Sequence, residues 1–169
     1  IDFIEKKPAS KSPAAPFTTS TLQQEASRKL GFSVTRTMQN AQRLYEAGLI
    51  SYMRTDSVNL SKQALIQAAS VIEKNYGKRY VRTHQYVTKK IGAQEAHEAI
   101  RPTDLTRMKA NVEYDQKRLY DLIWKRTLAS QMSLAKLERT VAKIVTDNHP
   151  HAFVARGEVV VFDGFLKLY

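Results

Sequence analysis

Cysteine is absent from this sequence of 169 residues, and carboxylates are scarce in it. Without a thiol the chain forms neither a disulfide nor a thiolate zinc site. No apolar run approaches the ~20 residues that a bilayer-spanning helix needs. We therefore expect a soluble protein of the cytoplasm without a membrane partner. A chain of this length buries one ordinary core and part of a second domain.

The shortage of acid leaves the chain strongly basic. Asp and Glu number 16 against 27 Lys and Arg, which gives a net charge of +11 and an isoelectric point near 9.9. A polyanion binds such a surface well because each neutralised phosphate releases condensed counterions. Nucleic acid is the partner that this charge favours. Anionic membranes and acidic proteins also attract basic chains, so charge alone leaves them open.

Metal-binding patterns are missing as well. The segment His149-Pro150-His151 places two histidines around a proline, which is typical of a turn when no third ligand is near. No Asp-x-Asp pair with a distant glutamate occurs in the sequence. We assign no metal ligand in this chain.

Extended segments are predicted at both ends. Residues 1–5 alternate as a strand, and a connector rich in Pro, Ser, Ala and Lys follows over residues 7–16. Near the other end, residues 140–145, a turn at residues 147–148 and a Val-rich run ending at Phe162 predict antiparallel strands. Because the chain begins and stops inside apolar extended runs, we expect a fragment of a longer protein.

Helical signals fill the region between these ends. Ser20 and Gln23 predict a capping box, and Gly31 is placed to close that helix in a left-handed conformation. Ser33 is placed to cap a second helix, which Gly48 stops. Two helices joined by a tight turn and followed by a short strand indicate a helix-turn-helix or winged-helix core, although any small helical bundle fits equally well. The fold class that we expect is α+β and mainly α.

Two more helices are predicted, one from Asn59 or Ser61 to Gly77 and one over about residues 112–132. Their apolar stripes, like those of the first two, predict which face is buried. The residues expected on the buried faces, in chain order, are Leu22, Ala26, Leu30, Met38, Ala41, Tyr45, Leu65, Ala69, Ile72, Tyr76, Leu119, Ile123, Trp124 and Leu128.

Basic residues alternate with rings over residues 78–92. Such interleaving suits single-stranded nucleic acid, because cations contact phosphates and rings stack on bases. A solvated loop explains the same pattern, since nothing in the sequence fixes these side chains in a groove. The role of this segment stays open.

The most informative stretch covers residues 48–57. If residues 49–54 form a short strand, alternation puts Ile50, Tyr52 and Arg54 on one face, where the phenol and the cation can meet one phosphate. A tyrosine hydroxyl, with a pKa near ~10, attacks poorly unless a cation favours its anion, and Arg54 supplies that cation. Packing in a core is nonetheless the commoner use of a tyrosine in a short apolar run.

The decade Gly-Leu-Ile-Ser-Tyr-Met-Arg-Thr-Asp-Ser, residues 48–57, closely resembles the active-site tyrosine motif of type IA DNA topoisomerases. Residues 16–26 and 41–48 resemble the segments that lead to this motif in that family. Residues 94–103, with the sequence Gln-Glu-Ala-His-Glu-Ala-Ile-Arg-Pro-Thr, are similar to its histidine segment. Four motifs in the family's order cover residues 16–103, and the resemblance is looser beyond them.

The resemblance implies a layout of three parts. Residues 1–16 would be a strand of a β-arch domain and a linker, residues 17–132 a winged-helix-like domain carrying the tyrosine, and residues 133–169 further, incomplete arch strands. In the family an acidic module binds Mg²⁺ and precedes the arch. That N-terminal module is not in this sequence, so we expect Mg²⁺ to be bound outside it and the chain alone to be inactive.

The resemblance also implies a mechanism. Tyr52 would attack a phosphodiester of single-stranded DNA, form a 5′-phosphotyrosyl link and free a 3′-hydroxyl, which reseals the break after the other strand passes. Negative supercoils would relax without ATP, in the nucleoid. Arg54 and His97 are the expected contacts of the scissile phosphate. The full set of expected DNA contacts is Arg54, Thr55, Ser57, His97 and Arg101.

Arg101 has an alternative use, because it can support the site directly or pair with Glu98 or Glu95. A rival to the whole interpretation is a winged-helix module that binds DNA or protein without catalysis, in which Tyr52 merely packs. The rival predicts polar residues exposed on the second helix. The catalytic hypothesis predicts Tyr52, Arg54 and His97 around one accessible hollow of phosphate size.

Overall fold

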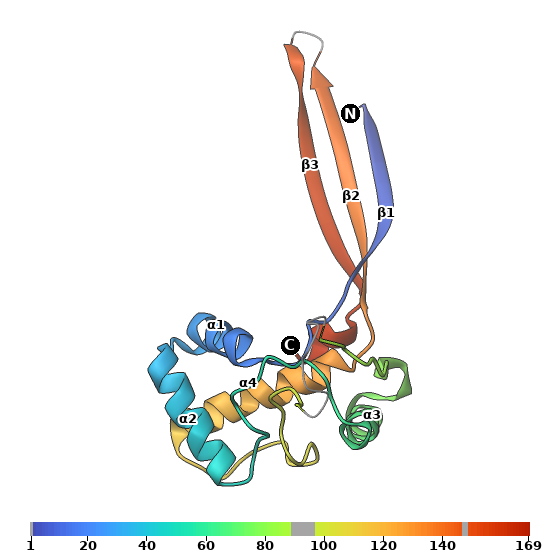
Figure 1. Cartoon of the computed structure of the whole chain (residues 1–169). Helices are drawn as coiled ribbons and strands as arrows, with labels where there is room; N and C mark the ends of the chain where they lie inside the picture. The colour runs from blue at the N-terminus through green and yellow to red at the C-terminus, as the bar shows by residue number, and fades with distance from the viewer. Residues whose placement is uncertain (1, 89–96, 147–148) are drawn as a thin grey trace.

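A computed structural model of the chain describes residues 2–88, 97–146 and 149–169. A long antiparallel sheet projects from a helical body, and the C-terminus returns to that body at the root of the sheet (Figure 1). This architecture confirms the expected α+β class. The elements in chain order are β1 (Phe3–Lys11), α1 (Thr19–Leu30), α2 (Val34–Glu46), α3 (Lys62–Tyr76), the 3₁₀ turn η1 (Lys78–Tyr80), α4 (Tyr114–Ser130), β2 (Ala135–Thr146), β3 (His149–Phe162) and the 3₁₀ turn η2 (Gly164–Lys167).

The sheet has the order β1-β2-β3, with both neighbouring pairs antiparallel. Strand β1 is longer than expected, because Lys7–Lys11 pair with β2 instead of forming a connector. The expectation failed at Pro8, which pairs with Glu138. Strand β1 has only one neighbour in this sheet, and a proline on such an edge can turn its missing N–H away from the ladder. The turn predicted at residues 147–148 lies outside the described part of the chain.

Local sequence signals predicted most of the helix ends correctly. Ser33 and Ser61 cap α2 and α3 by accepting from the amides of Arg36 and Ala64. Gly31 ends α1 at φ 70°. The cap of α1 is Thr18 rather than Ser20, because Thr18 has the partner that a capping box needs three residues on. Its amide donates to Thr21 Oγ1 at 2.9 Å, and its own side chain accepts from the Thr21 amide.

The buried face of α2 differs from the predicted one. Tyr45 is 41% exposed, whereas Thr37 and Asn40 are buried. Both polar side chains bond back to their own helix: Thr37 Oγ1 donates to Ser33 O at 2.9 Å and Asn40 Nδ2 to Arg36 O at 2.8 Å. Burial therefore costs them no hydrogen bond, and an apolar pattern cannot find such residues. In α3, Ile72 is buried as predicted, but the rest of the buried face is Ala64, Ala68 and Val71, whereas Leu65 and Ala69 are only partly buried.

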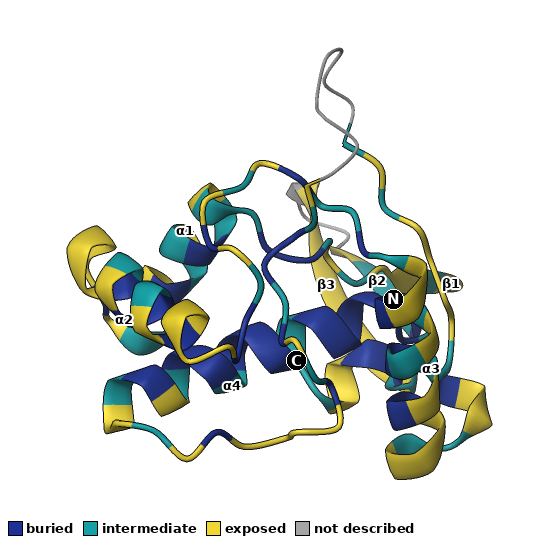
Figure 2. Cartoon of the chain, turned by 60° about the horizontal axis from the view of Figure 1, so that its bottom comes forward, coloured by how far each residue is buried: buried dark blue, intermediate teal, exposed yellow. Residues whose placement is uncertain are grey.

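Helix α4 is the centre of the helical body, and most of its length is buried (Figure 2). Leu119, Ile123, Trp124 and Leu128 are buried as predicted. Two of its rings also hold the irregular segment before it: Trp124 Nε1 donates to Leu105 O at 2.9 Å and the Tyr120 hydroxyl to Arg107 O at 2.6 Å. Burial raises the pKa of Tyr120 to about 12, which keeps this hydroxyl protonated as a donor.

None of the helices in the described ranges combines the length and apolar composition that a membrane crossing requires.

Candidate functional site

Tyr52 projects from an irregular turn. The predicted strand over residues 49–54 is wrong, since only Ile50 forms a bridge, to Pro102. Ile50 and Met53 are 1% and 2% exposed, while Tyr52 is 47% exposed. The chain bends after the bridge, so Ile50 and Tyr52 do not share a face. The phenol is presented to solvent by a backbone whose flanking apolar side chains are anchored in the core.

Ser51 ties this turn to the histidine segment. Its hydroxyl donates to Ala99 O at 2.7 Å and accepts from the Arg101 amide at 2.9 Å. Its own amide donates to Arg101 O at 2.8 Å. One residue before Tyr52 thus makes three hydrogen bonds to a segment about 50 residues away in the chain. The two motifs that the sequence singled out are joined here.

A second anchor holds the turn on the other side of Tyr52. Thr19 Oγ1 donates to Met53 O at 2.8 Å and accepts from the Thr55 amide at 2.8 Å. The Thr19 amide donates to Thr55 O at 2.9 Å. These bonds attach the turn to the first residue of α1. Tyr52 and Arg54 therefore stand on a backbone that is fixed before and after them, which preorganises a site.

Arg54 is exposed and lies beside α2. It shares a hollow with Arg43, Gln39 and other residues of the outer face of that helix. Neither Tyr52 nor His97 lines this hollow. It is therefore not the single hollow that we expected around Tyr52, Arg54 and His97. Tyr52 instead meets α2 through Tyr45, whose ring packs edge to face against it at 5.3 Å between centroids and 67° between planes.

Two of the expected DNA contacts are occupied in holding the turn. Ser57 is 4% exposed, and its hydroxyl accepts from the Asn59 amide at 3.1 Å. Thr55 Oγ1 accepts from the Ser57 amide at 3.0 Å. Burial leaves Ser57 no surface for a DNA phosphate in this conformation. Thr55 is partly exposed, and its contact with DNA stays a prediction.

Arg101 pairs with Glu98. Its Nε and Nη2 donate to Glu98 Oε2 at 3.1 and 2.7 Å, and Nη1 donates to Pro102 O at 2.9 Å. The arginine side chain is only 16% exposed. Of the alternatives for Arg101, the structure therefore contains the pair with Glu98, and Glu95 lies outside the described residues. Arg101 stabilises the histidine segment, and with its guanidinium so occupied it is a weak candidate for a DNA contact.

Glu98 also fixes the start of α3, since Oε1 accepts from the Ser61 amide at 2.6 Å. Partial burial acts to raise the pKa of Glu98, but the hydrogen bonds and charge of Arg101, with those from Ser61, outweigh it and hold that pKa below its ordinary value. Glu98 is therefore ionised at neutral pH. His97 is exposed beside this pair and two residues before the Ala99 carbonyl that Ser51 holds.

Sequence reasoning missed Thr19, the pairing role of Ser51 and the contact of Tyr45. Ser51 stood inside the quoted motif, so its position was visible but its partners were not. Thr19 and Tyr45 likewise lay in segments that resemble the family, but their partners are distant in sequence or on another element and could not be predicted.

The residues around Tyr52 do not suit Mg²⁺, which prefers several free carboxylate and carbonyl oxygens. Glu98 is committed to Arg101 and Ser61. Within the described ranges, no three His, Cys, Asp or Glu side chains are grouped to hold a metal ion.

Comparison with known proteins gives a consistent match. The sequence profile of the family described as DNA topoisomerase matches residues 1–169. DNA topoisomerase 1 of Zymomonas mobilis is 54% identical over 171 residues, covering 100% of this chain and 14% of the relative. DNA topoisomerase 1 of Rickettsia felis is 47% identical over 183 residues, covering 100% of this chain and 24% of the relative. The chain thus spans only a minor part of the length of these curated relatives.

Among solved structures, full-length topoisomerase I from Thermotoga maritima superposes with a TM-score of 0.85 at 38% identity. The match covers 98% of this chain and 28% of that protein. The similarity therefore includes both the helical body and the projecting sheet.

Proposed function

Because the chain belongs to the DNA topoisomerase family, which its match over all 169 residues shows, we propose that it is the strand-cleaving part of a type IA enzyme, with Tyr52 as the nucleophile. The observation that carries this proposal is the half-exposed phenol of Tyr52 on a turn anchored through Ser51 and Thr19. A residue that merely packed would not need such a support. The full-length enzyme would relax negatively supercoiled DNA.

The reaction is a pair of transesterifications. The Tyr52 phenol gives up its proton, and its oxygen attacks the phosphorus of a phosphodiester in single-stranded DNA. The new P–O bond joins Tyr52 to the 5′ phosphate of the downstream fragment, while the 3′ oxygen of the upstream fragment leaves and takes up a proton. After strand passage, the 3′-hydroxyl attacks the phosphotyrosine and restores the original bond. One phosphoester replaces another at each step, so no ATP is consumed.

Arg54 is assigned to the charge that develops on the scissile phosphate, because it is an exposed cation two residues after the nucleophile. It would also favour the anion of the attacking phenol. His97 is assigned as a second phosphate contact, on a segment that Ser51 joins to the tyrosine turn. Arg101 positions that segment through Glu98. Thr55 is a further DNA contact in this proposal.

The remaining parts of the enzyme are proposed to lie outside this chain. The helical body, residues 17–132, would be the winged-helix-like tyrosine domain, and β1, β2 and β3 would be pieces of a β-arch. Mg²⁺ and the general acid for the leaving oxygen would come from an acidic N-terminal module that docks beside Tyr52. Among the described residues, no cluster of carboxylate or imidazole side chains beside Tyr52 fits a metal.

A module that binds DNA or protein without catalysis is not favoured, because the matching relatives are named as topoisomerases. A module of that kind predicts polar residues exposed on α2, and Gln39 and Arg43 do line the hollow beside Arg54. These two residues fit equally well as a surface that binds the cleaved strand.

The polarity of the covalent link tests the proposal. The full-length enzyme is mixed with one oligonucleotide labelled at either end and quenched with denaturant. The 3′-end label should stay with the protein, and the 5′-end label should leave on a fragment that a polymerase extends from its 3′-hydroxyl. Protein linked to the 5′-labelled fragment, or no linked protein at all, would contradict the proposed chemistry.

A further inference from the structure

A basic hollow lies at the root of the sheet, away from Tyr52. Its volume is about 500 Å³. Three cationic side chains line it, Arg79, Arg82 and Lys136, together with Ser133, Leu134, Val161 and Phe162. No carboxylate is among these residues. Helices α2 and α3 lie toward opposite ends of α4 (Figures 1 and 2). The arginines of this hollow come directly after α3 in the chain, so the hollow is separate from the one that Arg54 lines beside α2.

The backbone under the two arginines is held in place by residues that follow α4. Val81 forms an antiparallel bridge with Met132, and the Arg82 amide donates to Gln131 O at 3.0 Å. Ser133 completes the pairing, since its amide donates to Tyr80 O and its hydroxyl to Arg79 O, both at 2.8 Å. The cations therefore do not come from a loose loop.

The opposite wall comes from the sheet. Lys136 pairs with Phe162 across β2 and β3, and the register shifts between Lys136 and Leu137, which leaves Val161 as an extra residue. A bulge of this kind re-aims the side chains beside it. The Arg79 guanidinium lies 4.3 Å from the centre of the Phe162 ring, a cation–π contact that holds the arginine against this wall.

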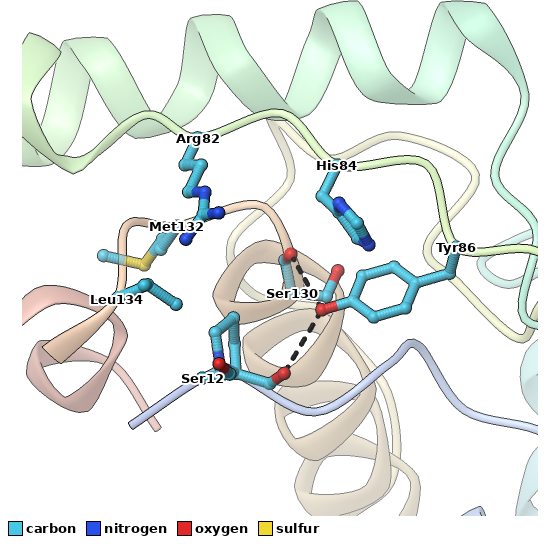
Figure 3. Close-up of a pocket in the computed structure, with 8 residues that line it drawn as sticks. Ser12, Arg82, His84, Tyr86, Ser130, Met132 and Leu134 are labelled. Atoms are coloured by element: carbon cyan, nitrogen blue, oxygen red, sulfur yellow. Dashed lines mark hydrogen bonds between the residues drawn. The ribbon is translucent and has the colours of Figure 1, made fainter. Parts of the chain in front are cut away.

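The rings of this segment are engaged elsewhere. The Tyr80 hydroxyl donates to Asp163 Oδ1 at 2.8 Å, and the Tyr86 hydroxyl donates to Pro13 O at 3.2 Å. Figure 3 shows Tyr86 directed into a smaller pocket of about 160 Å³, where Arg82 and Leu134 also lie. Tyr80 is only 8% exposed, so its ring offers no face for base stacking, and the Tyr86 ring packs against His84 at 4.5 Å between centroids. Two of the cations, in contrast, are available to a ligand, because Arg82 and Lys136 form no ion pair with any residue in the described ranges.

We propose that the basic hollow binds backbone phosphates of a DNA strand at a second place, distinct from the strand position at Tyr52. Three cations around a volume of nucleotide size, with a neutral lining and neighbouring carboxylates already bonded, match a phosphodiester better than any uncharged ligand. The assignment of the polyanion to DNA rests on the proposed function. The proposal gives Arg79 and Arg82, from the basic segment 78–92, a role in binding phosphate. Tyr80 and Tyr86 of the same segment hold the structure through their hydroxyl hydrogen bonds.

The test measures how the affinity of this chain for fluorescein-labelled oligothymidine depends on salt. Each phosphate contact on a single strand contributes about −0.7 to the slope of log K against log salt. The variant Arg82→Gln/Lys136→Gln should therefore have a slope shallower by about 1.4, the value for two lost contacts. The charge-preserving variant Arg82→Lys/Lys136→Arg should keep most of the original slope.

The matched control is Lys62→Gln/Lys74→Gln, which removes the same charge from exposed positions on α3. Its slope should change clearly less, and all variants should melt at the same temperature because the altered side chains are exposed. A slope for the hollow variant equal to that of wild type, or to that of the α3 control, overturns the proposal. Covalent adduct formation by full-length Arg82→Gln/Lys136→Gln is measured separately. An intact adduct together with an unchanged salt slope refutes phosphate binding in the hollow and leaves the proposed function standing. The absence of an adduct in the wild-type enzyme refutes the proposed function instead.

Discussion

The amide and carbonyl of Arg101 both bond to Ser51, with the Arg101 amide donating to Ser51 Oγ at 2.9 Å and the Ser51 amide donating to Arg101 O at 2.8 Å. Ser51 precedes the proposed nucleophile, and Arg101 lies in the histidine segment, four residues after His97. The position of the Tyr52 phenol relative to His97 therefore depends on these two hydrogen bonds, which join residues that are distant in the sequence.

Replacing Ser51 by alanine should destabilise the chain by about 1–3 kcal/mol, since it leaves the Arg101 amide and the Ala99 carbonyl without their partner. Urea unfolding measures this loss. The control is Ser70→Ala, an exposed position within α3, where the change should be neutral or stabilising by about 0.5 kcal/mol. Equal midpoints for the two variants would show that the Ser51 clamp adds nothing.

The Glu98 pair predicts a pH dependence. Because the folded-state pKa of Glu98 lies below its ordinary value, the pair stabilises the fold above the unfolded-state pKa, and this contribution is lost as pH falls through the folded-state pKa. Glu98→Gln should therefore destabilise most near neutral pH, and its unfolding free energy should approach that of wild type in acid. Asp104 and Glu158, whose pKa values are also lowered, act equally in both proteins. Parallel pH profiles would contradict this role for Glu98.

Arg54→Ala and His97→Ala in the full-length enzyme should slow cleavage by about 10²–10³-fold while weakening oligonucleotide binding far less, if both groups contact the phosphate in the transition state. Single-turnover cleavage and fluorescence anisotropy supply the two numbers. Arg43→Ala is the control, because Arg43 lines the same hollow as Arg54 and should affect affinity alone. Equal losses of rate and affinity at Arg54 would make it an ordinary binding residue.

This chain alone, with or without Mg²⁺, should bind single-stranded DNA weakly and with steep salt dependence, as its +11 charge implies. It should neither cleave the strand nor relax a plasmid, because we propose that the acidic module lies elsewhere. Gel mobility and plasmid relaxation assays check both points. Relaxation by the rigorously purified chain would require a general acid and metal site among these residues.

Sequence patterns predicted some of the local features of this fold. Ser33, Gly31 and the apolar face of α4 behaved as expected, whereas the cap of α1 and the buried faces of α2 and α3 did not. The turn at Tyr52 did not, because its shape follows from bonds to Thr19 and to residues 99–101.

At the site, residue type and motif singled out Tyr52 and Arg54, and both are exposed, while their roles stay predictions. Ser57 was expected to contact DNA, but it is buried and its hydroxyl accepts from the Asn59 amide. No pattern in the sequence indicates this hydrogen bond, so the burial could not be predicted. Arg101 could be placed only after the structure showed which carboxylate lies beside it.

The most direct measurement is a mass-spectrometric search for DNA covalently attached to tyrosine after denaturant trapping, in the full-length enzyme and in two variants. Tyr52→Phe removes one oxygen and should abolish the adduct while leaving DNA binding nearly unchanged. Tyr45→Phe removes the same atom from the ring packed against Tyr52 at 5.3 Å and should leave the adduct in place. Our account predicts a nucleotide on Tyr52 in wild type and in Tyr45→Phe, and none in Tyr52→Phe. An undiminished adduct in Tyr52→Phe would contradict it.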